Sequence, residues 1–378
     1  MLRLLHTADW QLGKPFHQIG GDPGALLRVA RFEAVARLAA LATEQAVDAV
    51  LVAGDVFDGN LVADRTLLQA MAAMRGFAGP WLLLPGNHDA ALAESAWTRL
   101  ERLDPPANLL IARTPAPIVL ADGRLVVLPA PLTERHSQDD LTAWMDTAAT
   151  PAMVLRVGLA HGSVADRLPA AAEAANPIAP DRAETARLDY LALGDWHGTL
   201  EIAPRTWYAG TPEPDRFKAN AAGQALLVEL DGPGAPPRVT PLATAAHAWQ
   251  EVALDLSATG DAEAPALRID RALAQGRCEL KRIVRLGLRG GVDLAARAGI
   301  AAVIERWHGE LRHLEVVDEL QAAPSASDLA RLAGQPAIGQ VARALAQEAL
   351  AGEAEARAVA ALALQLMFLE HERLGPER

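Results

Sequence analysis

The chain of 378 residues contains a single cysteine, Cys278, and no long apolar run. One cysteine excludes an intramolecular disulfide framework and an all-thiolate zinc site, and it is typical of a reducing compartment. Nowhere do about 20 apolar residues follow one another, and Met1 to Trp10 lacks the apolar stretch of a signal peptide. The sequence therefore predicts neither export nor a membrane span, and we expect a cytoplasmic protein whose metal ligands, if any, are not thiolates.

Positive charge is also scarce. The 35 Lys and Arg residues stand against 47 Asp and Glu residues, which gives a formal net charge of −12, and residues 1–248, 249–320 and 321–378 are each net negative. This balance excludes attraction of nucleic acid over the whole surface but leaves room for a local basic groove. The content of 51% hydrophobic and 22% charged residues is ordinary for a folded protein, and the length suits two or three domains.

Short apolar runs alternate with stretches of helical periodicity along the first 90 or so residues. This order predicts parallel strands joined by right-handed crossovers, so that the carboxyl ends of the strands lie along one edge of a sheet. Two further apolar runs and a hairpin around Asp122-Gly123 follow. The expected strands are Leu2–Leu5, Ala49–Ala53, Trp81–Leu84, Met153–Ala160 and Tyr190–Leu193, the helices are Ala25–Gln45 and Ala63–Phe77, and the hairpin is Pro117–Pro129.

Polar turns follow all five of these strands. Taken singly, an Asp in such a turn is most often a cap, and a histidine at a strand end is most often a packing residue. Together, carboxylates, amides and imidazoles after five successive strands are the donors that a binuclear metal centre requires. The five turns are His6-Thr7-Ala8-Asp9-Trp10-Gln11, Gly54-Asp55-Val56-Phe57-Asp58, Gly86-Asn87-His88-Asp89, His161-Gly162 and Gly194-Asp195-Trp196-His197-Gly198.

The order of these motifs resembles that of the calcineurin-like metallophosphoesterases. Within that superfamily, the turns that contain Asp9 and Asp55 are similar to those of the SbcD-like DNA-repair nuclease subunits. The resemblance extends over residues 1–217 and includes the segment Tyr208–Pro214. It implies an α/β fold, a two-sheet α/β sandwich with flanking helices, and hydrolysis of a phosphodiester with the help of two divalent metal ions.

The resemblance also implies a role for each polar residue. Two cations polarise the phosphodiester and neutralise charge on the entering and leaving oxygens. His88 stands where the family has its catalytic imidazole, which donates a hydrogen bond or a proton to the leaving oxygen. The implied ligands are Asp9, Asp55 and His197 for one ion and Asp55, Asn87, His161 and the position of Asp195 for the other, with Asp55 bridging the two.

The sequence departs from the family pattern at two positions. Gln11 and Asp195 stand where most members have histidine, which makes the donor set rich in oxygen. Such a set favours manganese, with magnesium as the alternative, over zinc. Gln11 is a neutral and poor donor, so the first ion site is expected to be the weaker one. Asp58 either contacts the substrate or caps its own loop.

The Pro- and Gly-rich residues 232–237 predict the end of the first domain. We divide the chain into a metallophosphoesterase domain at 1–245, an α+β capping and DNA-binding domain at 246–322, and a helical partner-binding region at 323–378. Arg285 and Arg289 lie an even number of positions apart on one expected strand and are candidate DNA contacts. A solvated face balanced by nearby acids explains them equally well.

The tail contains an expected helix from Glu353 to Arg373 with a wide apolar surface. Packing on its own domain is one explanation of this surface. The resemblance implies the other, docking on an SMC-like coiled-coil ATPase, and it leaves a homodimer open. The chain is therefore expected to be a DNA exonuclease subunit acting in DNA repair, with endonuclease activity left open. The alternatives are a phosphodiesterase or phosphatase for small or nucleotide substrates and a weakly active scaffold with an altered metal site.

Overall fold

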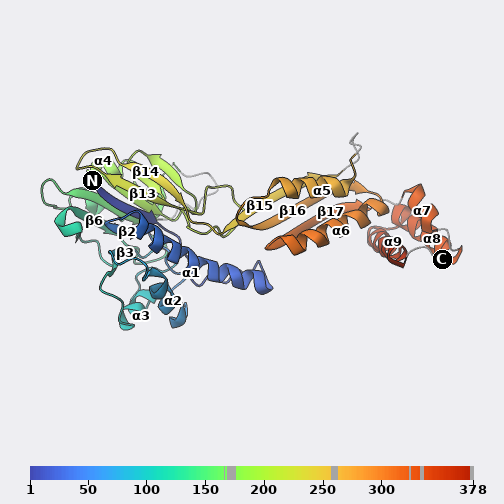
Figure 1. Cartoon of the computed structure of the whole chain (residues 1–378), viewed down its shortest axis with the longest axis horizontal. Helices are drawn as coiled ribbons and strands as arrows, with labels where there is room; N and C mark the ends of the chain where they lie inside the picture. The colour runs from blue at the N-terminus through green and yellow to red at the C-terminus, as the bar shows by residue number, and fades with distance from the viewer. Residues whose placement is uncertain (166, 168–175, 257–262, 323–324, 333–335, 375–378) are drawn as a thin grey trace. The chain divides into compact units, whose positions relative to one another are not determined.

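The structure is a computed structural model, and it describes residues 1–165, 167, 176–256, 263–322, 325–332 and 336–374. The chain divides into two compact units, Met1–His247 and Ala248–Arg378 (Figure 1). The boundary lies two residues after the predicted end of the first domain. The predicted division of the second unit at residue 322 stays a prediction.

Unit 1 contains two six-stranded sheets. In the first, neighbouring strands follow the order β14-β13-β1-β2-β3-β4. Strands β1 to β4 are parallel to one another, and β13 pairs antiparallel with both β1 and β14. The strands are β1 (Leu2–Thr7), β2 (Ala49–Val52), β3 (Trp81–Leu83), β4 (Leu109–Ile111), β13 (Gln224–Leu230) and β14 (Arg238–Ala243).

The second sheet has the order β11-β12-β10-β7-β6-β5. Its central strands β6, β7, β10 and β12 are parallel, and β5 and β6 form the predicted hairpin, in which Asp122 and Gly123 adopt positive φ angles of 53° and 84°. The strands are β5 (Ile118–Leu120), β6 (Leu125–Ala130), β7 (Leu155–His161), β10 (Tyr190–Gly194), β11 (Leu200–Ala203) and β12 (Thr206–Tyr208), with a separate short pair of β8 (Ser163–Val164) and β9 (Pro177–Ile178).

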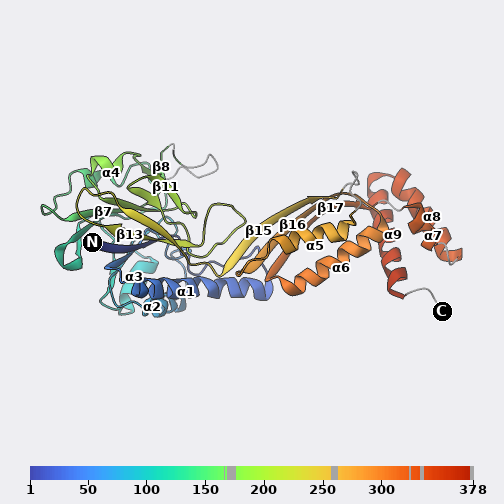
Figure 2. The same cartoon turned by 45° about the horizontal axis from the view of Figure 1, so that its top comes forward.

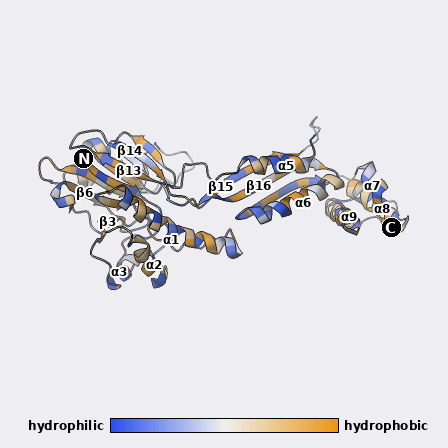
Figure 3. Cartoon of the chain, viewed as in Figure 1, coloured by the Kyte–Doolittle hydropathy of each residue, from blue (hydrophilic) through white to orange (hydrophobic). Residues whose placement is uncertain are grey.

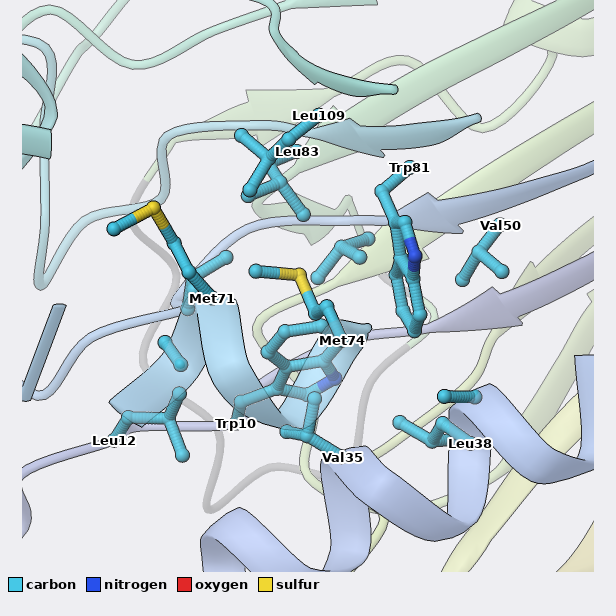
Figure 4. Close-up of a cluster of buried hydrophobic side chains, with 14 of the residues drawn as sticks. Trp10, Leu12, Val35, Leu38, Val50, Met71, Met74, Trp81, Leu83 and Leu109 are labelled. Atoms are coloured by element: carbon cyan, nitrogen blue, oxygen red, sulfur yellow. The ribbon is translucent and has the colours of Figure 1, made fainter. Parts of the chain in front are cut away.

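Helices cover the outer face of the first sheet. Alternate residues of β2 point to opposite faces, so Val50 and Val52 join the helix side while Ala49 and Leu51 face the second sheet. On the helix side two tryptophans from neighbouring segments, Trp10 and Trp81, meet edge to face at 5.9 Å (Figure 4). The helices are α1 (Gly21–Glu44), α2 (Asp64–Met74) and α3 (Ala96–Arg102). Short helical segments, η1 (Ala121–Gly123), η2 (Ala143–Asp146) and α4 (Arg182–Thr185), belong to the second sheet's half.

A buried apolar layer joins the inner faces of the two sheets, which confirms the predicted two-sheet α/β sandwich. The buried ring of His6 makes polar contacts across this layer. The ring of His6, on β1, donates from Nε2 to the Leu193 carbonyl at 3.1 Å and accepts from the Tyr190 hydroxyl at Nδ1 at 2.9 Å. Burial lowers the pKa of His6 to about 3, so the imidazole is neutral and acts as a fixed hydrogen-bonding group.

Unit 2 begins with a three-stranded sheet of order β15-β16-β17. Helices α5 and α6 lie side by side against it (Figure 2), and both carry hydrophilic residues beside hydrophobic ones (Figure 3), as helices that cover a sheet on one side do. The α+β character expected for this segment is therefore present. The elements are β15 (His247–Asp255), α5 (Pro265–Gln275), β16 (Lys281–Val292), α6 (Leu294–Glu310) and β17 (His313–Ala322).

Three helices end the described part of unit 2: α7 (Ala326–Leu332), α8 (Pro336–Ala351) and α9 (Ala354–Leu374). The predicted long helix corresponds to α9, whereas α8 was not expected. Leu364 and Phe368 of α9 are buried in a cluster that also contains Leu294 of α6. The stripe on the other side of α9 is exposed, with Val359, Leu362 and Leu366 between 54% and 63% accessible. Self-packing therefore covers only part of the apolar surface of α9.

Candidate metal centre

The polar turns after the strands meet at one place in unit 1. β1, β2 and β3 are parallel neighbours in the first sheet, and β7 and β10 are parallel neighbours in the second, so their carboxyl ends can supply residues to a common site. Asp9, Asp55 and His161 each offer one ligand atom there, and these atoms lie within 4.8 Å of one another. All three side chains are buried. The two sheets thus contribute jointly to one cluster of metal-ligating types.

The backbone around this cluster is held in left-handed turns. Asp9 and Asp55 have φ angles of 54° and 53°, an uncommon conformation that tight neighbouring contacts must stabilise. The amide of Asp9 donates to the Gly54 carbonyl at 3.1 Å, and the amide of Gln11 donates to the Asp55 carbonyl at 2.8 Å. Gly54 is required here, since a Cβ at this position would lie 2.2 Å from His161 Nδ1. The turns therefore aim the carboxylates at the imidazole.

Asp9 has the property expected of a metal ligand. Its Oδ1 accepts a hydrogen bond from the Asp195 amide at 3.1 Å, but its buried Oδ2 has no partner in the described part of the chain. Burial raises the pKa of Asp9 to about 6. A buried carboxylate oxygen without a partner costs free energy that a bound cation recovers. The residues present therefore fit a divalent ion.

His161 presents one nitrogen to the carboxylates. Its Nδ1 lies 2.8 Å from the Ala53 carbonyl, to which it donates, and this leaves Nε2 facing Asp55 Oδ1 at 3.5 Å and Asn87 Oδ1 at 3.1 Å. Asp195, whose pKa burial raises, has its Oδ1 3.7 Å from the same Nε2. Burial alone lowers the pKa of His161, but the surrounding carboxylates together raise it to about 9. The position beside Nε2 thus favours positive charge, which a divalent metal ion can supply.

His197 lies in different surroundings. Its Nδ1 is 3.3 Å from Asp215 Oδ1, and its Nε2 is 3.3 Å from the Nε2 atom of Gln11. Burial alone raises the pKa of Asp215, but His197, Arg216 and Lys14 together hold it well below its usual range. Lys14 also donates to Gln11 Oε1 at 2.8 Å. A charged network therefore surrounds the predicted ligand His197.

His88 lies at the edge of the centre, where its side chain is 33% accessible. Its Nδ1 donates to the Asp58 carbonyl at 3.0 Å, and its Nε2 is 3.9 Å from Asp55 Oδ2. The backbone amide of His88 donates to Asp55 Oδ1 at 2.9 Å. The Asp58 carboxyl is partly buried, which raises its pKa. His88 therefore combines a fixed ring orientation with access to solvent.

Asp89 has a structural position. Both of its oxygens accept backbone hydrogen bonds, one from Phe57 at 2.9 Å and one from Gly86 at 2.7 Å. Burial raises the pKa of Asp89 to about 8. Asp89 thus connects the turns after β2 and β3, and the sequence-based interpretation of Asp89 as an orienting or structural neighbour of His88 is compatible with these contacts.

Sequence reasoning missed three residues that organise the centre: Lys14, Asp215 and Arg31. Arg31 is a buried residue of α1, and its guanidinium donates to the Asp9 carbonyl at 2.9 Å and to the Glu213 carbonyl at 3.1 Å. No local motif marks it, because it occupies an ordinary position in a helical pattern. Asp215 follows directly after the segment Tyr208–Pro214, which is part of the family resemblance. This position was the one signal in the sequence that could have identified it.

The two cationic candidates of unit 2 are paired with acids. Arg285 donates to Glu315 at 3.0 Å and to Glu251 at 3.1 Å, and Arg289 lies 3.2 Å from Asp255. Exposed pairs of this kind balance charge without adding much stability. Their role in DNA binding stays a prediction.

Comparison with known proteins agrees with this geometry. Residues 2–151 match the model of the calcineurin-like phosphoesterase family, so a phosphoesterase domain of this family occupies the N-terminal part of the chain. The match includes Asp9, Asp55 and Asn87, whereas His161 and His197 lie beyond it and join the site through the fold.

The chain is also similar to part of a nuclease. Over 115 residues it is 36% identical to the SbcD subunit of the nuclease SbcCD from Rhodobacter capsulatus. The matched stretch amounts to 29% of this chain and 24% of that protein, so the similarity spans about a quarter of the relative's length. Among the described residues, no helix is both long and apolar enough to cross a membrane.

Proposed function

We propose that the chain is a metal-dependent DNA nuclease, an exonuclease with endonuclease activity left open, that hydrolyses phosphodiesters at a binuclear centre. The observation that carries the proposal is the buried group of Asp9, Asp55 and His161 inside a calcineurin-like phosphoesterase domain, with one Asp9 oxygen lacking a partner among the described residues. A donor set dominated by oxygen supports manganese, or magnesium, over zinc.

In this proposal Asp55 contributes to both ion sites. Bound ions would withdraw charge from the phosphodiester and favour its attack by water. Asp215 orients His197 through the contact at Nδ1, and Ala53 orients His161 in the same way. The proposed ligands are Asp9, Asp55, His197 and, weakly, Gln11 on one side and Asp55, Asn87, His161 and Asp195 on the other.

His88 is the proposed general acid. With Nδ1 donating to the Asp58 carbonyl, Nε2 is the nitrogen left to face a substrate. In the imidazolium form it donates a proton to the leaving oxygen, which needs one when the P–O bond breaks. Access to solvent at the edge of the centre suits this role.

DNA as the substrate is supported by the similarity to a nuclease subunit and by charge in unit 2. A cavity of about 440 Å³ there is lined by Arg277, Lys281, Arg282 and Arg312, with Glu310 as the single acid. Glu310 pairs with Arg277 at 2.9 Å, whereas Lys281 and Arg312 have no ion pair in the described residues. Such a cluster provides local phosphate contacts despite the acidic chain.

An SMC-like coiled-coil ATPase is the proposed partner, and DNA repair in the cytoplasm is the proposed setting. The exposed apolar stripe of α9 supports this partner, because helices with one free apolar face commonly dock on other helices. A second copy of the chain is the other partner considered. Removal of α9 should abolish ATPase binding while leaving cleavage of small phosphodiesters unchanged.

The decisive experiment compares cleavage of linear duplex DNA, single-stranded DNA, a chromogenic phosphodiester and a chromogenic phosphomonoester in manganese, magnesium and zinc. We expect cleavage of DNA and of the diester, best in manganese. Preference for the monoester, or no DNA cleavage under any condition, would overturn the proposal in favour of a small-substrate phosphatase or phosphodiesterase. Binding of an ATPase without any cleavage would indicate the weakly active scaffold.

A further inference from the structure

Four side chains form a closed ring of contacts on the His197 side of the centre. Lys14 Nζ donates to Gln11 Oε1 at 2.8 Å and to Asp215 Oδ2 at 2.5 Å. Asp215 Oδ1 lies 3.3 Å from His197 Nδ1, and His197 Nε2 lies 3.3 Å from Gln11 Nε2, which closes the ring. Gln11 is 2% accessible and Lys14 is largely buried, so the ring is shielded from competing water.

The ring determines which way the Gln11 amide points. An ammonium group has three donors and no acceptor, so only the amide oxygen of Gln11 can face Lys14. If the amide were reversed, its NH2 group would face Lys14, a contact between two donors. The amide nitrogen must therefore point the other way, where it faces His197 Nε2 and Asp55 Oδ2 at 3.3 and 3.5 Å. Lys14 thus fixes the orientation of the amide.

This orientation conflicts with an ion between Asp55 and His197. An amide nitrogen has no lone pair to offer a metal, and here it donates toward the two atoms that would otherwise be ligands. Positive charge adds to the conflict, since Lys14 contacts Gln11 and Arg216 lies 3.1 Å from His197 Nδ1. A divalent ion that entered would have to turn the amide and would meet repulsion from both cations.

The His161 side carries no comparable obstacle. In the described structure, the side chains of Asn87, His161 and Asp195 contact carboxylates, carbonyls, Ser163 and one another, but no Lys or Arg side chain. We therefore do not expect the two sides of the centre to bind divalent ions equally well.

We propose that Lys14, acting through Gln11, makes the two ion positions unequal. The ion on the His161 side binds first and firmly, and the ion on the His197 side binds only when the Gln11 amide leaves Lys14. Lys14 is thus a positioning residue that determines how many ions the centre holds at a given concentration. The inference rests on the proposed function only in requiring that the centre bind divalent ions.

The test is a manganese titration of the metal-free full-length chain, followed by calorimetry and by the electron paramagnetic resonance signal of free and spin-coupled manganese. For the unaltered chain we expect one firmly bound ion and a second bound at least about tenfold more weakly. In Lys14→Met the second affinity should rise by about tenfold, and the signal of a spin-coupled pair should appear at lower manganese concentration. Gln11→His should act in the same direction, because imidazole supplies a lone pair.

Two controls separate this effect from misfolding. Lys14→Arg keeps a donor-only cation opposite Gln11 and should retain unequal binding. Lys281→Met makes the same chemical change on β16 of unit 2 and should leave both ion affinities unchanged. An unaltered affinity for the first ion in Lys14→Met reports that the centre is intact.

Two results would overturn the inference: two equally tight ions in the unaltered chain, or an unchanged second affinity in Lys14→Met. Equal binding together with manganese-dependent DNA cleavage would remove the inference and leave the proposed function standing. Unequal binding without cleavage of any diester would contradict the proposed function and leave the inference standing.

Discussion

His161 and His197 both follow parallel strands of the second sheet and both face the carboxylates of the first, yet their surroundings differ in charge. A backbone carbonyl orients His161, and three carboxylates lie around it. A carboxylate orients His197, and Lys14 and Arg216 are bound to that same carboxylate. The contrast teaches that a ligand's residue type and its place after a strand are not enough to define an ion site. Under the proposed function, the charges that hold each imidazole would also decide how well its side of the centre binds an ion.

The largest effect is expected where the two sides share a ligand. Asp55→Asn should remove ion binding on both sides and reduce phosphodiester cleavage to background, because the shared negative charge is lost while size and turn geometry are kept. Calorimetric manganese titration and a cleavage assay measure the two losses. Asp104→Asn is the matched control, since Asp104 is exposed and also has a φ of 53°. An Asp55→Asn protein that still bound one ion normally would show that the sides are independent.

A substitution that removes no proposed ion ligand should separate the chemical step from metal binding. His88→Ala should lower kcat by roughly 10²- to 10⁴-fold through loss of proton donation, with both ion affinities unchanged. His136→Ala, which removes an exposed imidazole, should leave kcat unaltered. Full cleavage of DNA by His88→Ala would contradict the assigned acid.

The His161 side should be the more sensitive to pH. Because the pKa of metal-free His161 is raised to about 9, an entering ion must displace a proton at any lower pH. The affinity of the first ion should therefore rise by up to about tenfold per pH unit from pH 7 toward 9, with about one proton released per ion. Potentiometric measurement of proton release during titration checks the sign. Proton uptake, or an affinity independent of pH, would contradict it.

The smallest effect is expected from the group that orients His197. Asp215→Asn removes a buried negative charge from beside Lys14 and Arg216, and it should weaken the second ion by about tenfold while sparing the first. Asp231→Asn, at an exposed pair with Arg238, serves as control. If the first ion weakens equally, the two sides are coupled more closely than their contacts indicate.

The sequence predicted the fold well where an apolar run of strand length is followed directly by a polar turn. The strands before Asp9, Asp55 and His161 were located within a few residues, and the polar turns after them meet in the structure as expected. Lys14 and Asp215 were missed because they lie 201 residues apart and no local pattern joins them. Helix α8 was missed although its apolar residues recur with helical spacing, because the glycine and proline around its start also indicate a loop in the sequence.

The contact between His6 and Tyr190 has a consequence for the spacing of the ligands. Asp9 and Asp55 belong to one sheet and His161 and Asp195 to the other, so any sliding of the sheets would change the distances across the centre. The pKa of the imidazole that joins the sheets is lowered to about 3, whereas the pKa of His161 is raised to about 9. Between these pH values, protons and metal ions can compete for the proposed ligands while the contact that aligns the two sheets stays unchanged.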